Sequence, residues 1–124
     1  DCIIVPEQNS AAINSDAMKT SSGALNNIKI CRTWNLKMTL QILKDNGIQI
    51  VSCTEKTKNN IYSLNYQIPT AVILGSEENG ISSEFLKLSD EKVKIPILGN
   101  IESLNVSVAC GVILYEIVRQ RYSV

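Results

Sequence analysis

Histidine is absent from this chain of 124 residues, which removes several common kinds of catalytic and metal site. Ser-His and Cys-His nucleophile pairs cannot form within the chain, so its chemistry must use other groups. A zinc site loses its usual nitrogen ligand, and the cysteines are widely spaced with no C-x-x-C pair, so we expect no metal. The four cysteines are expected to be reduced and mostly buried, as in a cytosolic protein: Cys2, Cys31, Cys53 and Cys110.

A surplus of charge of one sign and a long apolar run are lacking too. Twelve lysines and arginines balance twelve aspartates and glutamates, so net charge gives no argument for a nucleic-acid partner and leaves only a local patch open. The longest apolar run, residues 108–114, is too short to span a bilayer. No basic segment precedes a sustained apolar stretch at the N-terminus. We expect a soluble, cytoplasmic protein with no membrane contact.

Short apolar runs of strand length alternate with helical patterns along the chain. Strands are predicted at residues 2–5, 28–32, 48–53, 70–74 and 92–95. Helices are predicted at residues 36–46, ending at Gly47, and at 82–88, capped by Ser82 or Ser83, while 16–26 indicates one broken helix or two turns. Residues 55–67 are polar and turn-rich, which favours a flexible connection. The alternation predicts one α/β domain over residues 1–124, built on a parallel sheet with helices on both faces.

A glycine-punctuated loop, LGSEENGIS at residues 74–82, follows one of these strands. Ligands of open α/β sheets bind outside the carboxyl ends of the strands. Gly75 would let the backbone approach a ligand closely, and Gly80 would supply a positive φ. The alternative, that both glycines only turn the chain, carries equal weight because a lone G-x-x-x-x-G is a weak signal.

The end of the chain, residues 95–121, reads IPILGNIESLNVSVACGVILYEIVRQR. A loop through residues 103–105 leads into a helix N-terminus, whose unpaired N–H groups suit a small polar ligand. This helix is apolar nearly all round, so it needs cover on more than one side. In one interpretation the sheet packs on one side of the helix and a second subunit on the other. In the other, which carries equal weight, the helix is a single core helix buried within this domain. Arg119 and Arg121 are interpreted as partners of the helix dipole rather than as RNA contacts.

LGSEENGI and KIPILGNIESLNVSVACGVILYEIVRQR together resemble the second and third motifs of the SpoU (TrmH-like) branch of the SPOUT RNA methyltransferases. KTSSGAL at residues 19–25 and RTWNLKMTLQILKDNGIQIV from Arg32 resemble further segments of that family. The resemblance covers nearly the whole chain. It implies an α/β domain with a deep C-terminal trefoil knot, a feature nearly absent from other proteins.

The resemblance also implies an S-adenosylmethionine site in the knot and a homodimer formed through the region of the C-terminal helix. Carried over by position, the cofactor-binding residues are Gly75, Ile95, Ser103, Leu104 and Asn105. Glu77 and Asn105 are expected to support catalysis by orienting ribose and cofactor, or else to satisfy backbone groups of their loops.

The implied activity is that of an RNA 2′-O-methyltransferase, acting on a ribose hydroxyl of ribosomal or transfer RNA. An alcohol is a poor nucleophile at neutral pH, so a base and in-line geometry are required. The family usually assigns that role to an arginine in a first motif, N-x-G-x-x-x-R, which this chain lacks. Arg32 lies in the wrong segment to replace it and is interpreted as a surface or structural residue.

The chain begins on a predicted strand without an initiator methionine, which favours a fragment that is poorly stable or inactive by itself. The alternative function is a non-catalytic module of the same fold that binds the cofactor or RNA, or that serves in dimerisation.

Overall fold

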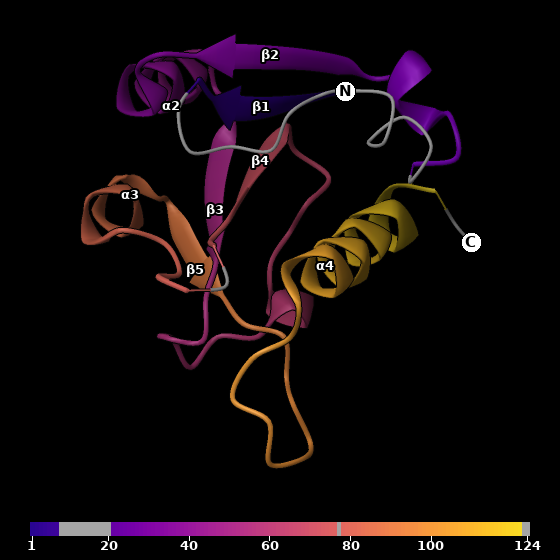
Figure 1. Ribbon diagram of the computed structural model, residues 1–124. Coiled ribbons are helices and arrows are strands. Elements are labelled where there is room, and N and C mark those ends of the chain that lie inside the picture. Colours follow the sequence, from indigo (N-terminus) through magenta and orange to yellow (C-terminus); the bar gives the residue numbers. More distant parts are fainter. Residues whose placement is uncertain (8–20, 77, 123–124) are drawn as a thin grey trace. The chain divides into compact units, whose positions relative to one another are not determined.

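Within the described residues, 1–7, 21–76 and 78–122, five strands form two parallel sheets in a computed structural model of the chain (Figure 1). The chain divides into two units, Asp1–Thr39 and Leu40–Val124, and one sheet belongs to each. The sequence pattern predicts a single sheet, and this expectation is corrected. A pattern of apolar residues identifies each strand, but strand pairing depends on contacts between residues far apart in the chain.

The first unit contains a two-stranded sheet. β1 (Cys2–Pro6) pairs in parallel with β2 (Lys29–Thr33), and the 3₁₀ helix η1 (Ala24–Asn26) lies in the connection between them. Residues 8–20 lie outside the described residues, so the predicted broken helix at 16–26 is tested only over its second part, where Ser21 to Gly23 form a turn ahead of η1.

The helix α2 (Leu36–Asp45) has a defined cap at each end. Asn35 begins it, because its side-chain oxygen accepts a hydrogen bond from the backbone N–H of Met38 at 3.0 Å. Gly47 ends it in the left-handed region, with φ at 81°. The N–H of Ile48 bonds the carbonyl of Leu43, and the N–H of Gly47 bonds that of Lys44, both at 3.1 Å. This Schellman arrangement confirms the glycine stop predicted at Gly47.

The second unit contains a three-stranded sheet in the order β4-β3-β5, all parallel. The strands are β3 (Gln49–Cys53), β4 (Thr70–Leu74) and β5 (Glu91–Val93). Figure 1 shows α3 (Ser83–Leu88) and α4 (Val106–Arg121) on opposite sides of this sheet. Helices therefore cover both faces of this three-stranded sheet, as the alternating sequence pattern predicts.

The two faces of β3 pack against different partners. Val51 belongs to a hydrophobic core with Val93 and with Ile113 and Ile117 of α4. On the opposite face, Ser52 hydrogen-bonds Ser89, which follows α3. The N-cap of α3 is Ser82, whose hydroxyl accepts from the N–H of Phe85. The period of two along a strand thus places α4 against one face and the end of α3 against the other.

The connection between β3 and β4 contributes to the core. The 3₁₀ helix η2 (Ile61–Ser63) buries Ile61 completely, and Tyr66 is also fully buried, with its hydroxyl donating to the carbonyl of Ile61 at 2.8 Å. Burial, the nearby Cys53 and Glu116 raise the pKa of Tyr66 to about 12, so the hydroxyl keeps its proton. The sequence pattern favours a flexible connection here, whereas the structure shows a packed segment, because two apolar side chains among polar neighbours carry the packing.

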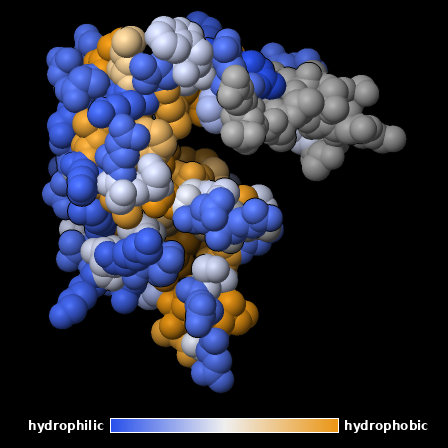
Figure 2. All heavy atoms as spheres, turned by 60° about the vertical axis from the view of Figure 1, so that its left-hand side comes forward, coloured by the Kyte–Doolittle hydropathy of each residue, from blue (hydrophilic) through white to orange (hydrophobic). Residues whose placement is uncertain are grey.

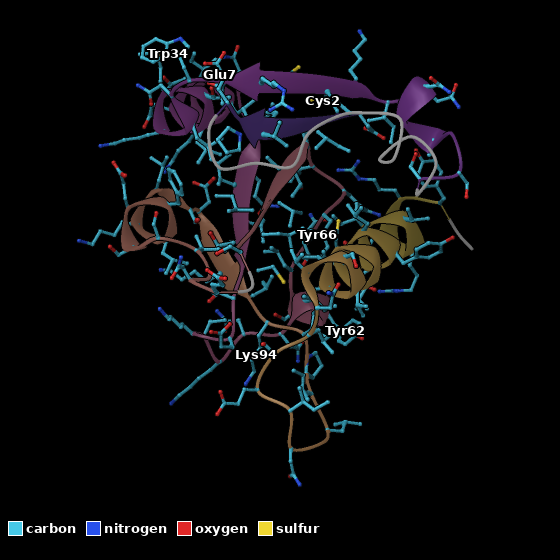
Figure 3. All side chains as sticks on the ribbon, viewed as in Figure 1. Cys2, Glu7, Trp34, Tyr62, Tyr66 and Lys94 are labelled. Carbon is cyan, nitrogen blue, oxygen red and sulfur yellow. The ribbon has the colours of Figure 1, made fainter. Side chains whose placement is uncertain are left out.

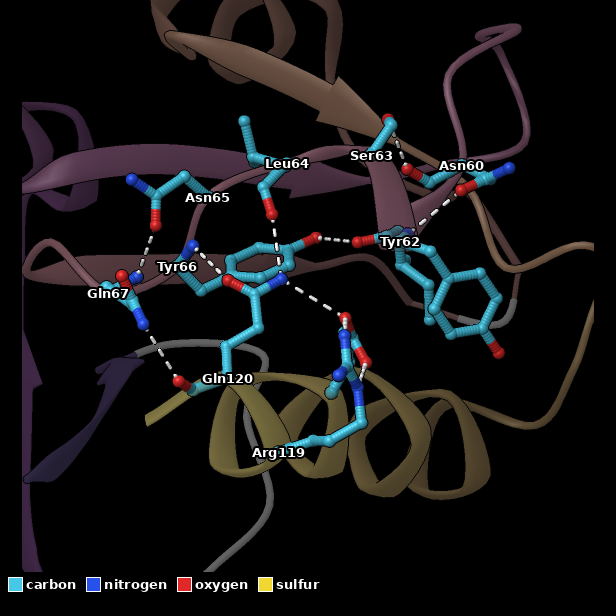
Figure 4. A network of polar contacts seen from close by, with 11 residues as sticks. Asn60, Tyr62, Ser63, Leu64, Asn65, Tyr66, Gln67, Arg119 and Gln120 are labelled. Carbon is cyan, nitrogen blue, oxygen red and sulfur yellow. Dashed lines mark hydrogen bonds and ion pairs between the residues drawn. The ribbon is translucent and has the colours of Figure 1, made fainter. Parts of the chain in front are cut away.

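Gln120 of α4 holds this connection in place (Figure 4). Its side-chain oxygen accepts from the N–H of Tyr66 at 2.8 Å, while its side-chain nitrogen donates to the carbonyl of Leu64 at 2.8 Å and to Glu116 at 3.1 Å. Arg121 donates to the carbonyls of Tyr66 and Ile68. The last turn of α4 is therefore tied to the β3–β4 connection.

Glu116 is a buried carboxylate that uses two partners from its own helix. Arg119 donates to both of its oxygens at 2.8 Å, and Gln120 supplies a third hydrogen bond. The hydrogen bond from Arg119 lowers the pKa of the Glu116 carboxyl, with Gln120 adding to it and burial opposing it. Arg119 and Arg121 lie in the last turn of α4, where the helix-dipole interpretation places them, and each also makes a side-chain contact that the sequence did not predict.

The remaining local expectations are largely confirmed. All five strands, α2, α3 and α4 occur where predicted, with shifts of one or two residues at their ends. The expectation that the cysteines are mostly buried is wrong: Cys2 and Cys31 are exposed, and Cys53 and Cys110 are half-buried, all as free thiols. The burial of a cysteine on a strand depends on whether another element covers its face of the sheet, which composition does not reveal. Among the described residues, no helix combines the length and the hydropathy needed to cross a membrane.

Candidate functional site

A cleft of about 410 Å³ opens at the carboxyl ends of the three parallel strands of the second unit. Cys53 ends β3, Leu74 ends β4 and Lys94 directly follows β5, and all three line the cleft. The opposite wall comes from the loop before α4 and from the first turn of that helix, through Val106 and Ala109. A site at this edge is the arrangement expected for a ligand of a parallel α/β sheet.

The glycine loop after β4 forms one wall of the cleft. The N–H of Gly80 donates to the carbonyl of Ser76 at 2.9 Å, and Ser76 and Gly80 form an antiparallel bridge. Gly80 has φ at 65°, which confirms the predicted positive φ. A Cβ built on Gly75 would lie 2.3 Å from the carbonyl carbon of Gly80 and 2.6 Å from the nitrogen of Ile81. The backbone that comes close to Gly75 is thus that of Gly80 and Ile81 in the same loop. A residue without a Cβ is needed here for the loop to close.

The second wall depends on the start of α4. Asn105 caps this helix, because its side-chain oxygen accepts from the N–H of Ser107 at 2.9 Å and also from the Ser107 hydroxyl. Ser103 and Leu104, immediately before the cap, line the cleft. Asn105 itself is not among the lining residues. Its capping bonds agree with the interpretation in which it satisfies backbone groups of the loop.

The charged groups of the cleft are of both signs. Glu55, Glu78 and Glu102 contribute carboxylates, and Lys56 and Lys94 contribute ammonium groups (Figure 3 labels Lys94). Burial raises the pKa of the Cys53 thiol, with Cys110 and Glu55 adding to the effect. Cys53 is therefore a neutral, weakly reactive thiol in the lining of the cleft.

Four of the predicted site residues meet in this cleft: Gly75, Ile95, Ser103 and Leu104. Glu77 lies outside the described residues. Sequence reasoning missed the contributions of β3 and of the turn after it, notably Thr54, Glu55 and Lys56. The signal was available, because residues 54–56 directly follow a predicted buried strand and therefore share the edge at which parallel strands end.

The loop of residues 96–104 extends from the cleft with apolar side chains at its tip. Leu98 is 99% exposed and Ile101 is 67% exposed. Figure 1 shows this loop as the lowest part of the view, and Figure 2 shows hydrophobic side chains on the same projection. Exposed large apolar residues beside a cleft are typical of a surface that contacts another molecule.

Comparison with known proteins identifies a family and several RNA methyltransferases that resemble this chain. The sequence model of the SpoU rRNA Methylase family matches residues 1–115. The 23S rRNA (guanosine-2′-O-)-methyltransferase RlmB of Yersinia pestis is 38% identical over 119 residues, which cover 96% of this chain and 48% of that protein. An uncharacterized tRNA/rRNA methyltransferase of Mycobacterium leprae is 39% identical over 96% of this chain and 38% of its own length. The chain thus spans about half the length, or less, of these curated relatives.

Solved structures show the same likeness. The A. aeolicus TrmH/SpoU tRNA modifying enzyme superposes with a TM-score of 0.85 at 33% identity, over 98% of this chain and 62% of that one. The SpoU methyltransferase AviRb from Streptomyces viridochromogenes, solved in complex with the cofactor AdoMet, gives a TM-score of 0.87 at 27% identity, over 98% of this chain and 50% of that one.

Proposed function

The chain belongs to the SpoU rRNA Methylase family, and we propose that it forms the cofactor-binding part of an enzyme that methylates a ribose 2′-hydroxyl of ribosomal or transfer RNA, with S-adenosylmethionine as the methyl donor. The observation that carries the proposal is the cleft, because it brings Gly75, Ile95, Ser103 and Leu104 together at the carboxyl edge of the sheet. The names of the relatives support the same reaction and both classes of RNA.

The cleft fits S-adenosylmethionine in size and in chemistry. Its volume of about 410 Å³ lies within the range of small-molecule pockets. Apolar side chains such as Leu74, Ile95 and Leu104 suit the flat adenine ring. The carboxylates of Glu78 and Glu102 suit a ligand that carries a positive sulfonium and an ammonium group.

We assign cofactor binding to five residues. Gly75, Ile95, Ser103 and Leu104 line the cleft and contact the ligand, mostly through backbone groups of the two loops. Asn105 acts by capping α4, which holds Ser103 and Leu104 in position at the wall. We further assign Glu77 and Asn105 a supporting role in catalysis, in which they orient the ribose and the cofactor.

The chemistry requires a hydroxyl to lose its proton as it attacks the methyl carbon. When bound, S-adenosylmethionine supplies a methyl group on a positively charged sulfur, which leaves as a neutral thioether. The protein must hold the ribose in line with that bond and must accept the proton. Arg32 belongs to β2 in the first unit and is not assigned to this task.

S-adenosylmethionine is expected to bind the chain in isothermal titration calorimetry, and Leu104→Asp is expected to weaken binding at least about tenfold, because a carboxylate would replace an apolar wall of the cleft. Leu98→Asp is the matched control. Leu98 lies in the same loop, is fully exposed and does not line the cleft, so this variant should bind within about twofold of the wild type. A folded wild-type chain that releases no heat at high cofactor concentration would contradict the proposed function.

We further propose that the C-terminal region forms a deep trefoil knot and that a second copy of the chain covers α4. The apolar pattern of α4 needs cover on more than one side, and the structure leaves Val108, Leu114 and Tyr115 exposed, with Tyr115 at 74%. Gly111 lies on the same stripe as Val108 and Tyr115, which would let a partner helix approach closely. The exposed stripe favours the two-subunit interpretation of the sequence over a single buried helix.

Sedimentation equilibrium should detect a homodimer of the wild-type chain. Tyr115→Glu is expected to shift the protein to monomer, because two copies of a carboxylate would lie in an apolar contact. Tyr62→Glu is the control, since Tyr62 is 56% exposed and belongs to η2 rather than to α4. A wild-type chain that stays monomeric at every concentration would overturn the dimer.

A further inference from the structure

Four lysines gather where β3 and β5 end. Lys92 lies in β5 and Lys94 directly follows it, while Lys56 and Lys58 lie in the turn after β3. The turn wraps around the end of β5: Thr57 donates to the carbonyl of Lys92 at 3.4 Å, and the N–H of Lys94 donates to the carbonyl of Asn59 at 2.8 Å. Residues 38 positions apart in the chain therefore form one local cluster, named here the lysine cluster (Lys56, Lys58, Lys92 and Lys94).

The ammonium groups of the lysine cluster have no ion-pair partner among the described residues. Lys44 shows the contrast, because its ammonium group pairs with Asp90 at 3.5 Å and donates to the carbonyl of Leu88 at 3.1 Å. Glu55 and Glu91 adjoin the cluster in sequence and moderate its positive potential without pairing with it. Within the part of the chain that the structure describes, these four positive charges therefore stabilise no ion pair.

The position of the cluster matches the geometry of an RNA substrate. Lys56 and Lys94 line the cleft, and Lys58, two residues after Lys56, is exposed. A ribose in an RNA chain is flanked by a phosphate on each side, so a 2′-hydroxyl that enters the cleft brings phosphates to the surrounding surface. Lysines in protein–nucleic acid contacts bind phosphates as point charges and fix the register of the strand.

We propose that the lysine cluster is a contact surface for the RNA phosphates next to the target ribose. Lys56 and Lys94 are positioning residues at the cleft, and Lys58 and Lys92 extend the surface along the RNA strand. This inference rests on the proposed function, since it takes the substrate to be RNA. It also explains how a chain of zero net charge attracts a polyanion, through one local group of lysines.

The test measures affinity for a short, fluorescently labelled single-stranded RNA of mixed sequence at several salt concentrations. Lys56→Gln combined with Lys58→Gln should weaken binding about tenfold at low salt, and should reduce the slope of log K against log salt by about 1.4, at roughly 0.7 for each lost phosphate contact. Lys56→Arg combined with Lys58→Arg keeps both charges and should retain the wild-type slope. Circular dichroism melting verifies that each variant is folded.

Lys87→Gln is the control for a general loss of charge, because Lys87 is an exposed lysine on α3 that does not line the cleft. An equal loss of slope in this variant, or no change of slope in the Lys56 and Lys58 pair, overturns the lysine cluster as the RNA contact. Calorimetry with S-adenosylmethionine on the same wild-type sample separates the two proposals. If the wild type binds the cofactor but the double Lys56→Gln, Lys58→Gln variant keeps the wild-type salt slope for RNA, only the proposed RNA surface fails. If the wild type binds no cofactor, the proposed function fails, and the salt slope still decides whether the lysines bind RNA.

Discussion

Gly75→Ala is expected to destabilise the second unit by about 3 kcal/mol and to abolish detectable binding of S-adenosylmethionine. The added Cβ would lie 2.3 Å from the carbonyl carbon of Gly80 and 2.7 Å from its Cα, and both are backbone atoms that a side-chain rotation cannot move. The loop of residues 76–81 must therefore open. Because Gly75, Gly80 and Ile81 all line the cleft, opening this loop also changes the shape of the site.

Gly99→Ala provides the matched control for Gly75→Ala. Gly99 lies in the other loop that leads to the cleft, and a Cβ built on it meets nothing within 4 Å. The Gly99→Ala substitution should change the free energy of unfolding by less than about 0.5 kcal/mol. Urea denaturation gives the free energy of unfolding of each variant, and calorimetry gives cofactor binding. Equal stability and equal binding for Gly75→Ala and Gly99→Ala would show that the close approach at Gly75 does not determine the loop.

Tyr66→Ala is expected to cost about 3–5 kcal/mol of the free energy of unfolding, the range for truncation of a buried aromatic side chain. Tyr66 is fully buried against α4, in contact with the core that contains Ile113 and Ile117 (Figure 3). Tyr66→Phe isolates the hydroxyl. It should cost about 1–3 kcal/mol, because the buried carbonyl of Ile61 loses its hydrogen bond.

Tyr62→Phe is the control for the Tyr66 variants. Tyr62 lies four residues earlier, on η2, and is 56% exposed, so removal of its hydroxyl should change the free energy of unfolding by less than about 0.5 kcal/mol. Urea denaturation of the wild type and of these three variants compares their free energies of unfolding directly. If Tyr66→Ala unfolds at the wild-type urea concentration, the β3–β4 connection is not part of the core and its bonds to Gln120 are incidental (Figure 4).

Local chemistry explains which features were predictable from sequence. Gly47 and Ser82 end and begin their helices through bonds to residues a few positions away. Gly80 takes a positive φ inside a short loop. Each of these features depends on neighbours within five residues, so the pattern of residue types is sufficient to predict them.

Features that depend on distant contacts were not predictable in the same way. The burial of Tyr66 requires α4, which begins forty residues later, and its N–H bonds Gln120 of that helix. No local pattern in the sequence predicts this burial. Cys2 and Cys31 are exposed because of where their strands lie, which cysteine's usual preference for burial does not indicate. The walls formed by Glu55 and Lys56 become part of the cleft only because β3, β4 and β5 end at one edge.

The amino-acid sequence by itself determined the α/β class, the order and approximate positions of the elements, the membership of the SpoU family and the four residues that meet in the cleft. It did so because turn residues, caps and a long gapless motif are local properties of the chain. The tertiary structure decided the division into two sheets, the structural role of Gln120, the reason for glycine at position 75, and the gathering of the lysine cluster where β3 and β5 end. These properties arise only when strands and loops far apart in the sequence are brought together, since backbone approach and charge pairing depend on distances in space.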